Sequence, residues 1–116
     1  MSDFTIYHNP RCSKSRNTLA LLQEHGIEPD IVLYLETKPG VGEINGLLKK
    51  LGMPASHLVR RGEEAYKSCK LSPESTEEAM VAAMAEHPKL IERPIVVCGD
   101  RAVLGRPPEN VLQLID

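Results

Sequence analysis

Cys12 is the residue of this sequence best placed to do chemistry. It follows a short apolar run, Phe4 to Tyr7, and precedes a helix-like stretch, Ser13 to His25, so it falls where a strand is expected to end and a helix to begin. The first N–H groups of a helix have no partner within it, and the helix dipole is positive at that end. A thiolate is stabilised there, so the pattern predicts a thiol with a lowered pKa that acts as a nucleophile.

Three cationic residues lie close to this cysteine in the sequence: Arg11, Lys14 and Arg16. They are expected to add positive charge around the thiol. A drop of two units in its pKa would raise the thiolate fraction at pH 7 from ~3% to ~75%. The alternative for a single cysteine is a buried structural role, but the turn position and the neighbouring cations argue against burial.

Length and composition limit the kinds of protein that this sequence can encode. A chain of 116 residues suits one domain that folds without disulfides or metal. The net charge of −2 gives no reason to expect nucleic-acid binding. No stretch approaches the ~20 apolar residues of a membrane span, and the N-terminus is no secretory signal, so we expect a cytoplasmic protein. Three widely spaced cysteines suggest neither a disulfide framework nor a zinc site.

The first part of the chain predicts a βαβ unit. The run from Phe4 to Tyr7 is a strand, the stretch from Ser13 to His25 is a helix ended by Gly26, and the apolar segment from Asp30 to Leu35 is a second strand covered on both faces. A strand, helix and strand joined by short loops form a right-handed crossover. The two strands should therefore be parallel.

The middle of the chain, about residues 41–88, is expected to be wholly helical. Apolar residues from Ile44 to Leu51 recur at helical spacing, and a less regular stretch with a short turn of helix near Glu63 to Lys67 follows. Ser75, with Glu78 three residues later, is typical of a capping box that opens a helix to about Glu86.

The last part predicts a hairpin and a helix. Ile95 to Cys98 and Arg101 to Leu104 flank the tight turn Gly99-Asp100, which favours two antiparallel strands. A final helix carries the apolar residues Val111, Leu112, Leu114 and Ile115. The predicted order is βαβ, a helical insertion, then ββα, all within one domain of residues 1–116.

The order of elements, with a cysteine after the first strand and Arg93-Pro94 just before the third, resembles the thioredoxin fold. That resemblance implies a mixed four-stranded sheet with flanking helices and a cis proline facing the cysteine. The motifs His-Asn-Pro-x-Cys-x-x-Ser-Arg-Asn-Thr, Leu-Tyr-Leu-Glu, Leu-Val-Arg-Arg, His-Pro-x-Leu-Ile-x-Arg-Pro-Ile-Val-Val and Gly-Arg-Pro-Pro-Glu are similar, over essentially the whole chain, to the glutaredoxin-coupled arsenate reductase family.

The resemblance implies a role for each of several residues. The family's nucleophile falls on Cys12, and the positions that tune its thiolate fall on His8 and Ser15. The family's three oxyanion-binding arginines fall on Arg60 (or its neighbour Arg61), Arg93 and Arg106. Guanidinium groups suit a tetrahedral oxyanion because they offer paired donors in a fixed fork. From the residues alone, His8 is equally a turn residue, and Ser15 is equally a helix cap.

The activity implied by the resemblance is the reduction of arsenate to arsenite. The Cys12 thiolate would attack arsenic(V), glutathione would attack the adduct, and glutaredoxin would complete the reduction. No metal and no bound cofactor are implied, because glutathione acts as a co-substrate from solution. With no heptad pattern, we expect a monomer.

Two alternatives stay open at this point. Ser13 and Lys14 stand where longer family members have Gly-Thr, and the chain ends soon after the last helix. A monothiol glutathione-linked oxidoreductase with another substrate is therefore one alternative. The other is a protein-binding regulator of the Spx type, although that branch typically has Cys-x-x-Cys where this chain has serine at position 15.

Overall fold

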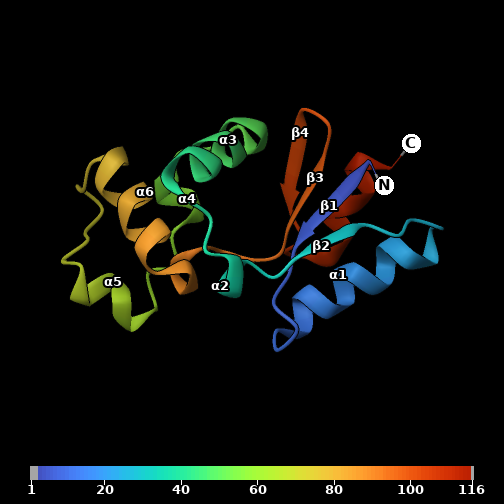
Figure 1. The fold of residues 1–116 in the computed structure, drawn as a ribbon, viewed down its shortest axis with the longest axis horizontal. Helices are drawn as coiled ribbons and strands as arrows, with labels where there is room; N and C mark the ends of the chain where they lie inside the picture. Colours follow the sequence, from blue (N-terminus) through green and yellow to red (C-terminus); the bar gives the residue numbers. More distant parts are fainter. Residues whose placement is uncertain (1–2, 116) are drawn as a thin grey trace. The chain divides into compact units, whose positions relative to one another are not determined.

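The structure, a computed structural model, describes residues 3–115 and divides into two compact units (Figure 1). We call residues 3–37 with 93–115 the sheet unit, and residues 38–92 the helical unit. The helical unit corresponds to the insertion expected at about 41–88. That both units form a single domain stays a prediction.

Four strands make the sheet unit. They are β1 (Phe4–Tyr7), β2 (Asp30–Val32), β3 (Ile95–Cys98) and β4 (Arg101–Leu104), in the order β2-β1-β3-β4. β1 runs parallel to β2 and antiparallel to β3, and β3 and β4 form the antiparallel hairpin. The predicted mixed four-stranded sheet is confirmed.

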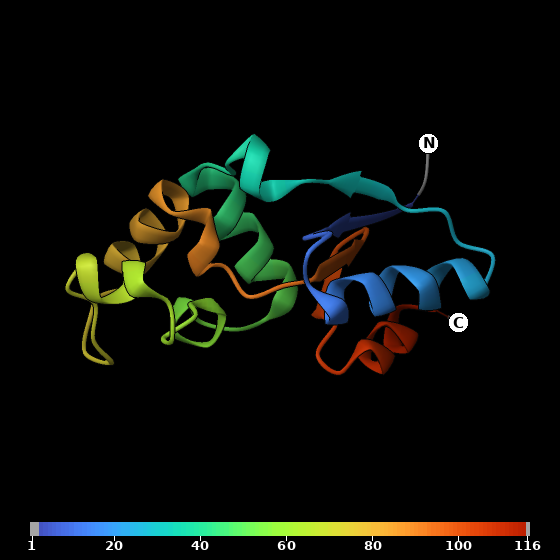
Figure 2. The ribbon, with the colours of Figure 1, turned by 90° about the horizontal axis from the view of Figure 1, so that it is seen from below.

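One face of this sheet is covered by α1 (Ser13–Glu24) and the 3₁₀ helix η2 (Pro108–Leu114), which pack on the same side (Figure 2). A buried cluster joins the sheet to both helices through Ile6, Leu22, Val96, Val111 and Leu114. Each such side chain contributes about 1.5–3 kcal/mol when it leaves water. This core fixes where α1 begins. The predicted last helix exists, but its geometry is 3₁₀.

The predicted second strand, parallel to the first, is confirmed over residues 30–32, but its extension to Leu35 and its burial on both faces were wrong. β2 ends at Val32, and the short helix α2 (Tyr34–Thr37) follows. β2 lies at the edge of the sheet, where Ile31 is 50% exposed. An apolar run alone does not distinguish an edge strand from a central one, because the difference depends on which strands pair.

The helical unit confirms the prediction for the middle of the chain. Its elements are α3 (Val41–Leu51), α4 (Ala55–Leu58), α5 (Glu64–Ser68), α6 (Glu77–Glu86) and η1 (Pro88–Leu90). α6 packs against α3, α4 and η1. Ile44, Leu47 and Leu48 are buried as their spacing predicts. Within residues 3–115, no helix has the length and apolar character needed to cross a membrane.

The cap of α6 differs from the prediction by one residue. Thr76, not Ser75, is the N-cap, and its side-chain oxygen accepts a hydrogen bond from the N–H of Ala79 at 3.1 Å. The hydroxyl of Ser75 instead accepts from the N–H of Ser72 at 2.9 Å, which closes the preceding turn. Two adjacent hydroxyl residues offer the same signal, and the turn before the helix decides between them.

Candidate active site

A tight turn carries the chain from β1 into α1. The N–H of Cys12 donates to the carbonyl of Asn9 at 3.0 Å, and the side-chain oxygen of Asn9 accepts from the N–H of Arg11 at 3.0 Å. Cys12 is the N-cap residue of α1, and its carbonyl accepts the first helical hydrogen bond from Arg16 at 3.0 Å. The predicted position of this cysteine at the junction of strand and helix is confirmed.

The thiol of Cys12 is partly exposed and electrostatically activated. Burial raises the pKa of Cys12, but three groups together outweigh it. The backbone N–H groups of Ser15 and Lys14, at the start of α1, and the guanidinium of Arg93 all stabilise the thiolate, and each lowers the pKa. The pKa of Cys12 is therefore lowered, which is the direction expected for a nucleophile.

The charge that lowers this pKa does not come from the cations expected. Arg11, Lys14 and Arg16 are all exposed, and the guanidinium of Arg16 donates to the carbonyl of Pro10 at 2.8 Å. Arg93, distant in sequence but next to β3, supplies the charge instead. Exposed charges are largely screened by water, whereas a charge beside a partly buried sulfur is screened much less.

His8 and Ser15 form a buried pair beneath the turn. His8 is 6% exposed and Ser15 is 0% exposed. Nδ1 of His8 lies 2.6 Å from the hydroxyl of Ser15, which also accepts the N–H of Asn9 at 3.0 Å. Ser15 therefore serves the loop and not the helix cap. The structure joins both residues to the cysteine loop, while their role in tuning the thiolate stays a prediction.

The protonation state of His8 follows from its surroundings. Burial, and then the positive charge of Arg16, lower the pKa of His8, so its imidazole is neutral near pH 7. In a neutral ring, Nδ1 accepts a hydrogen bond when Nε2 carries the hydrogen. The Ser15 hydroxyl can then donate to His8 while accepting from Asn9. In this arrangement His8 holds the loop in place without adding charge.

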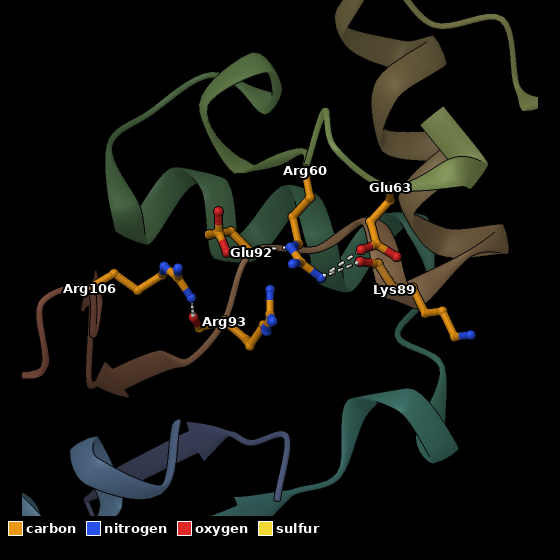
Figure 3. A network of polar contacts seen from close by, with 6 residues as sticks. All are labelled: Arg60, Glu63, Lys89, Glu92, Arg93 and Arg106. Carbon is orange, nitrogen blue, oxygen red and sulfur yellow. Dashed lines mark hydrogen bonds and ion pairs between the residues drawn. The ribbon is translucent and has the colours of Figure 1, made fainter. Parts of the chain in front are cut away.

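Arg93 and Arg106, which each precede a proline, are joined by a hydrogen bond within the sheet unit. The Arg93–Pro94 bond is cis, as the fold resemblance implies, and the Arg106–Pro107 bond is also cis, which the sequence did not suggest. A guanidinium nitrogen of Arg106 donates to the carbonyl of Arg93 at 3.4 Å (Figure 3). The predicted residues Cys12, Arg93 and Arg106 are thus linked through Arg93.

Gly105 permits this approach, and no sequence pattern indicated its role. Its N–H donates to the carbonyl of Pro94 at 2.9 Å. A Cβ atom at Gly105 would lie 2.5 Å from the hydroxyl of Thr18 and 2.8 Å from the ring of Pro94. Only a residue without a side chain fits between α1 and the proline. A lone glycine before Arg-Pro-Pro suggested no more than a chain break.

Arg60 has different surroundings. It belongs to the helical unit, where Nη1 lies 3.2 Å from a carboxylate oxygen of Glu63 and Nε lies 3.6 Å from one of Glu92 (Figure 3). Arg61 is exposed. Whether either one binds an oxyanion stays a prediction, because the structure pairs Arg60 with acids of its own unit.

Among residues 3–115, neither metal ligands nor the other two cysteines add to the site around Cys12. Within residues 3–115, no three or more His, Cys, Asp and Glu residues cluster as metal ligands. Cys98 is half-buried and packs against the core of the sheet unit, and Cys69 follows α5. Both are free thiols, and neither contributes to the site around Cys12.

Comparison with known proteins places these features in a family. The model of the ArsC family matches residues 7–114, a range that includes the cysteine turn, Arg93 and Arg106. The chain belongs to the ArsC family. Its four-stranded mixed sheet with flanking helices is the thioredoxin-like architecture of the solved structures it resembles.

Three similar proteins show how far the similarity extends along the chain. An uncharacterized protein of Escherichia coli K12, YfgD, is 54% identical over 95% of this chain and 94% of its own length. A protein of Haemophilus influenzae named arsenate reductase is 49% identical over 95% of this chain and 97% of its own. A structure described as arsenate reductase from Vibrio cholerae has 53% identity and a TM-score of 0.93, covering 97% of both chains.

Proposed function

We propose that this protein is an arsenate reductase that uses the Cys12 thiolate as its nucleophile and takes electrons from glutathione and glutaredoxin. The observation that carries the proposal is the lowered pKa of the Cys12 thiol, which stands at the N-cap position of α1 and is stabilised as the thiolate by the guanidinium of Arg93. Relatives named arsenate reductase support the choice of substrate.

The reaction balances with two thiols as the source of electrons. The Cys12 thiolate attacks arsenic(V), a sulfur–arsenic bond forms, and one protonated oxygen leaves as water. The glutathione thiol displaces a second oxygen, again as water. Glutaredoxin then attacks the glutathione sulfur, forming a mixed disulfide and leaving an electron pair on arsenic, which becomes arsenic(III). Water releases arsenite and returns Cys12 to its thiolate form.

The groups around the sulfur suit the first of these steps. Negative charge develops on the arsenate oxygens during attack, and guanidinium forks with helix N–H groups are fixed donors for such oxygens. Removing one donor of this kind typically costs about 10²–10³-fold in rate. Arg93 and Arg106 are the side chains of the sheet unit assigned to this role.

The reductants are proposed to come from solution and not from a bound cofactor. Ser15 stands where a second cysteine would be needed for an internal disulfide, and it is buried against His8. An external thiol must therefore complete the reduction. Glutathione is abundant in the cytoplasm, where thiols stay reduced, so we place the protein there and expect it to act as a monomer.

The deciding experiment mixes purified protein, arsenate, glutathione and glutaredoxin and measures arsenite. We expect arsenite above the level given by Cys12→Ser, and a Cys98→Ser variant as active as the wild type. Arsenate should also protect Cys12 from alkylation. Arsenite at only the level of the Cys12→Ser control would exclude the proposed reaction.

A second candidate is a monothiol oxidoreductase that removes glutathione from modified proteins. The presence of one activated thiol with serine at position 15 favours it, because a lone thiolate is also the nucleophile needed to form a mixed disulfide with glutathione. Release of glutathione from a labelled glutathionylated peptide, measured beside the arsenite assay, separates the two. Release without arsenite production would favour this candidate.

A further inference from the structure

A cavity lies beside the cysteine turn and has no role in the reaction so far. Its volume is about 340 Å³, and it is formed within the sheet unit by two segments of the chain. Asn9, Pro10 and Arg11 come from the turn that leads to Cys12, and Leu33, Leu35 and Glu36 come from the region of α2. The volume is at the lower end of the ~300–1,000 Å³ typical of small-molecule sites.

The walls of the cavity combine apolar surface with one charge of each sign. Leu33 and Leu35 are half-buried, while Arg11 and Glu36 are exposed. Within the described part of the chain, the contacts of Arg11 and Glu36 involve only their backbone N–H groups, to Asn9 and Leu33. The guanidinium and the carboxylate therefore remain available to a ligand that carries both charges.

The position of the cavity relates it to the nucleophile. Arg11 is the residue immediately before Cys12, and consecutive Cα atoms are ~3.8 Å apart. Cys12 itself is outside the lining, so a molecule in the cavity would leave the Cys12 sulfur free to carry an arsenic adduct. A ligand bound by Arg11 would be held by the residue next to the one that carries that adduct.

We propose that this cavity binds the thiol co-substrate, a small peptide-like thiol with a free amino group and a free carboxylate, of which glutathione is the example. Glu36 pairs with the ammonium group, Arg11 pairs with a carboxylate, and the two leucines contact the methylene groups. This inference rests on the proposed use of glutathione and adds where that thiol binds.

The chemistry of the walls disfavours the oxyanion as the occupant. The carboxylate of Glu36 repels an anion. Leucine side chains also cannot replace the water molecules that hydrate an oxyanion in solution. A purely apolar ligand is equally disfavoured, because it would leave both charged groups without a partner. A zwitterion with a short aliphatic chain matches all three features of the cavity.

The test uses S-methylglutathione, which cannot react, and the Cys12→Ser protein, so that binding is measured without chemistry. Titration calorimetry should show binding that Arg11→Ala and Glu36→Gln each weaken about two- to fivefold, as for an exposed ion pair. The matched controls Arg101→Ala and Glu28→Gln remove the same charges from exposed positions of the sheet unit outside the cavity, and both should bind as the parent protein does.

The outcomes separate this site from the proposed function. Weakened binding in both cavity variants supports the site even if no arsenite is ever produced. Absence of binding, or equal binding by all four variants, overturns the site even if the arsenite assay succeeds. If the cavity variants slow turnover only through glutaredoxin while S-methylglutathione binds normally, the cavity is a protein contact and the proposal is wrong.

Discussion

Two arginines in the two units of this molecule show how differently the same side chain can be used. In the sheet unit, Arg93 directs its guanidinium at the sulfur of Cys12 and lowers its pKa. In the helical unit, Arg60 pairs with Glu63 and Glu92. The first charge acts on a reactive group, whereas the second is balanced by acids of its own unit.

The difference shows that the role of an arginine in a sequence motif depends on the groups that its side chain contacts. The sequence places both arginines in family motifs, and each was predicted to bind an oxyanion. In the structure, the backbone carbonyl of Arg93 accepts a hydrogen bond from the guanidinium of Arg106. The next residue, Pro94, packs closely against Gly105. The ion pairs of Arg60 are instead with Glu63 and Glu92 of the helical unit.

The largest expected effect compares one glycine from each unit. Gly105→Ala places a methyl group against Thr18 and Pro94, so we expect the free energy of unfolding to fall by about 1–3 kcal/mol. Gly46→Ala, within α3 and with open space around its Cβ position, should instead gain about 0.5–1 kcal/mol. Denaturant titration measures both changes.

The same pair of variants tests whether the close approach serves the site. Gly105→Ala should also slow alkylation of Cys12 at pH 6.5, because it pushes the Arg93 and Arg106 segments away from α1. Gly46→Ala should leave that rate unchanged. Equal stability and equal alkylation in the two variants would show that Gly105 has no positioning role.

The second prediction compares the two arginines directly. Arg93→Ala removes the charge and hydrogen bond that lower the pKa of Cys12, so its alkylation profile should move to higher pH. Where the pKa lies above 6.5, each unit of upward movement lowers the rate at pH 6.5 roughly tenfold, about 1.4 kcal/mol. Arg60→Ala should leave the profile in place.

The measurement is the rate of iodoacetamide alkylation from pH 5 to 9 in a background without Cys69 and Cys98. Arg93→Lys is the matched control, since it keeps the charge but lacks the fork of donors, and it should fall between wild type and Arg93→Ala. A profile that moves as much for Arg60→Ala as for Arg93→Ala would remove the contrast between the units.

A third, smaller effect comes from His8. Its pKa is lowered by burial and by Arg16, so below about pH 6.5 the unfolded chain binds a proton that native His8 does not. Stability contributed by this neutral histidine is therefore complete above that pH and declines as the pH falls toward the folded pKa. The advantage of wild type over His8→Gln should shrink between pH 7.5 and pH 5.

The measurement is the unfolding free energy of both proteins across this range, with His57→Gln of the helical unit as the control. An advantage that grows as the pH falls would mean that native His8 is protonated more easily than in the unfolded chain. That result would assign the buried pair of His8 and Ser15 a charged imidazole, contrary to the geometry described here.

Much of this molecule was predictable because the signals are local. Periodicity gave α1 and α3, the Gly99-Asp100 turn gave the hairpin, and the position of Cys12 followed from the strand and helix beside it. The edge position of β2 depends on strand pairing, and the exposure of Ile31 follows from it. No local pattern contains that information.

The surroundings of Cys12 were only partly predictable from the sequence. Family motifs named Arg93, while the neighbours of Cys12 suggested that the charge would come from Arg11, Lys14 and Arg16. The contact between Arg93 and the sulfur requires the chain to return after the whole helical unit. The fit of Gly105 against Thr18 likewise depends on tertiary packing, which single-residue signals do not describe.

The smallest expected effect concerns the acid beside Arg60. Glu63→Gln removes one carboxylate from a partly exposed ion pair, so we expect the unfolding free energy to change by less than about 1 kcal/mol. If Arg60 joins the anion site as the family motif implies, the variant should let arsenate protect Cys12 from alkylation at up to about fivefold lower concentration. A measurement of protection against arsenate concentration checks this.

The double variant Glu63→Gln with Arg60→Ala shows whether any gain in protection by arsenate depends on the guanidinium of Arg60. Loss of the gain in the double variant would show that the freed guanidinium meets the anion, and the contrast with Arg93 would then be one of degree. Protection that is the same in wild type, Glu63→Gln and Arg60→Ala would instead leave arsenate to Arg93, Arg106 and the N-terminus of α1. In that case Arg60 serves the helical unit, where its two carboxylate partners already account for its charge.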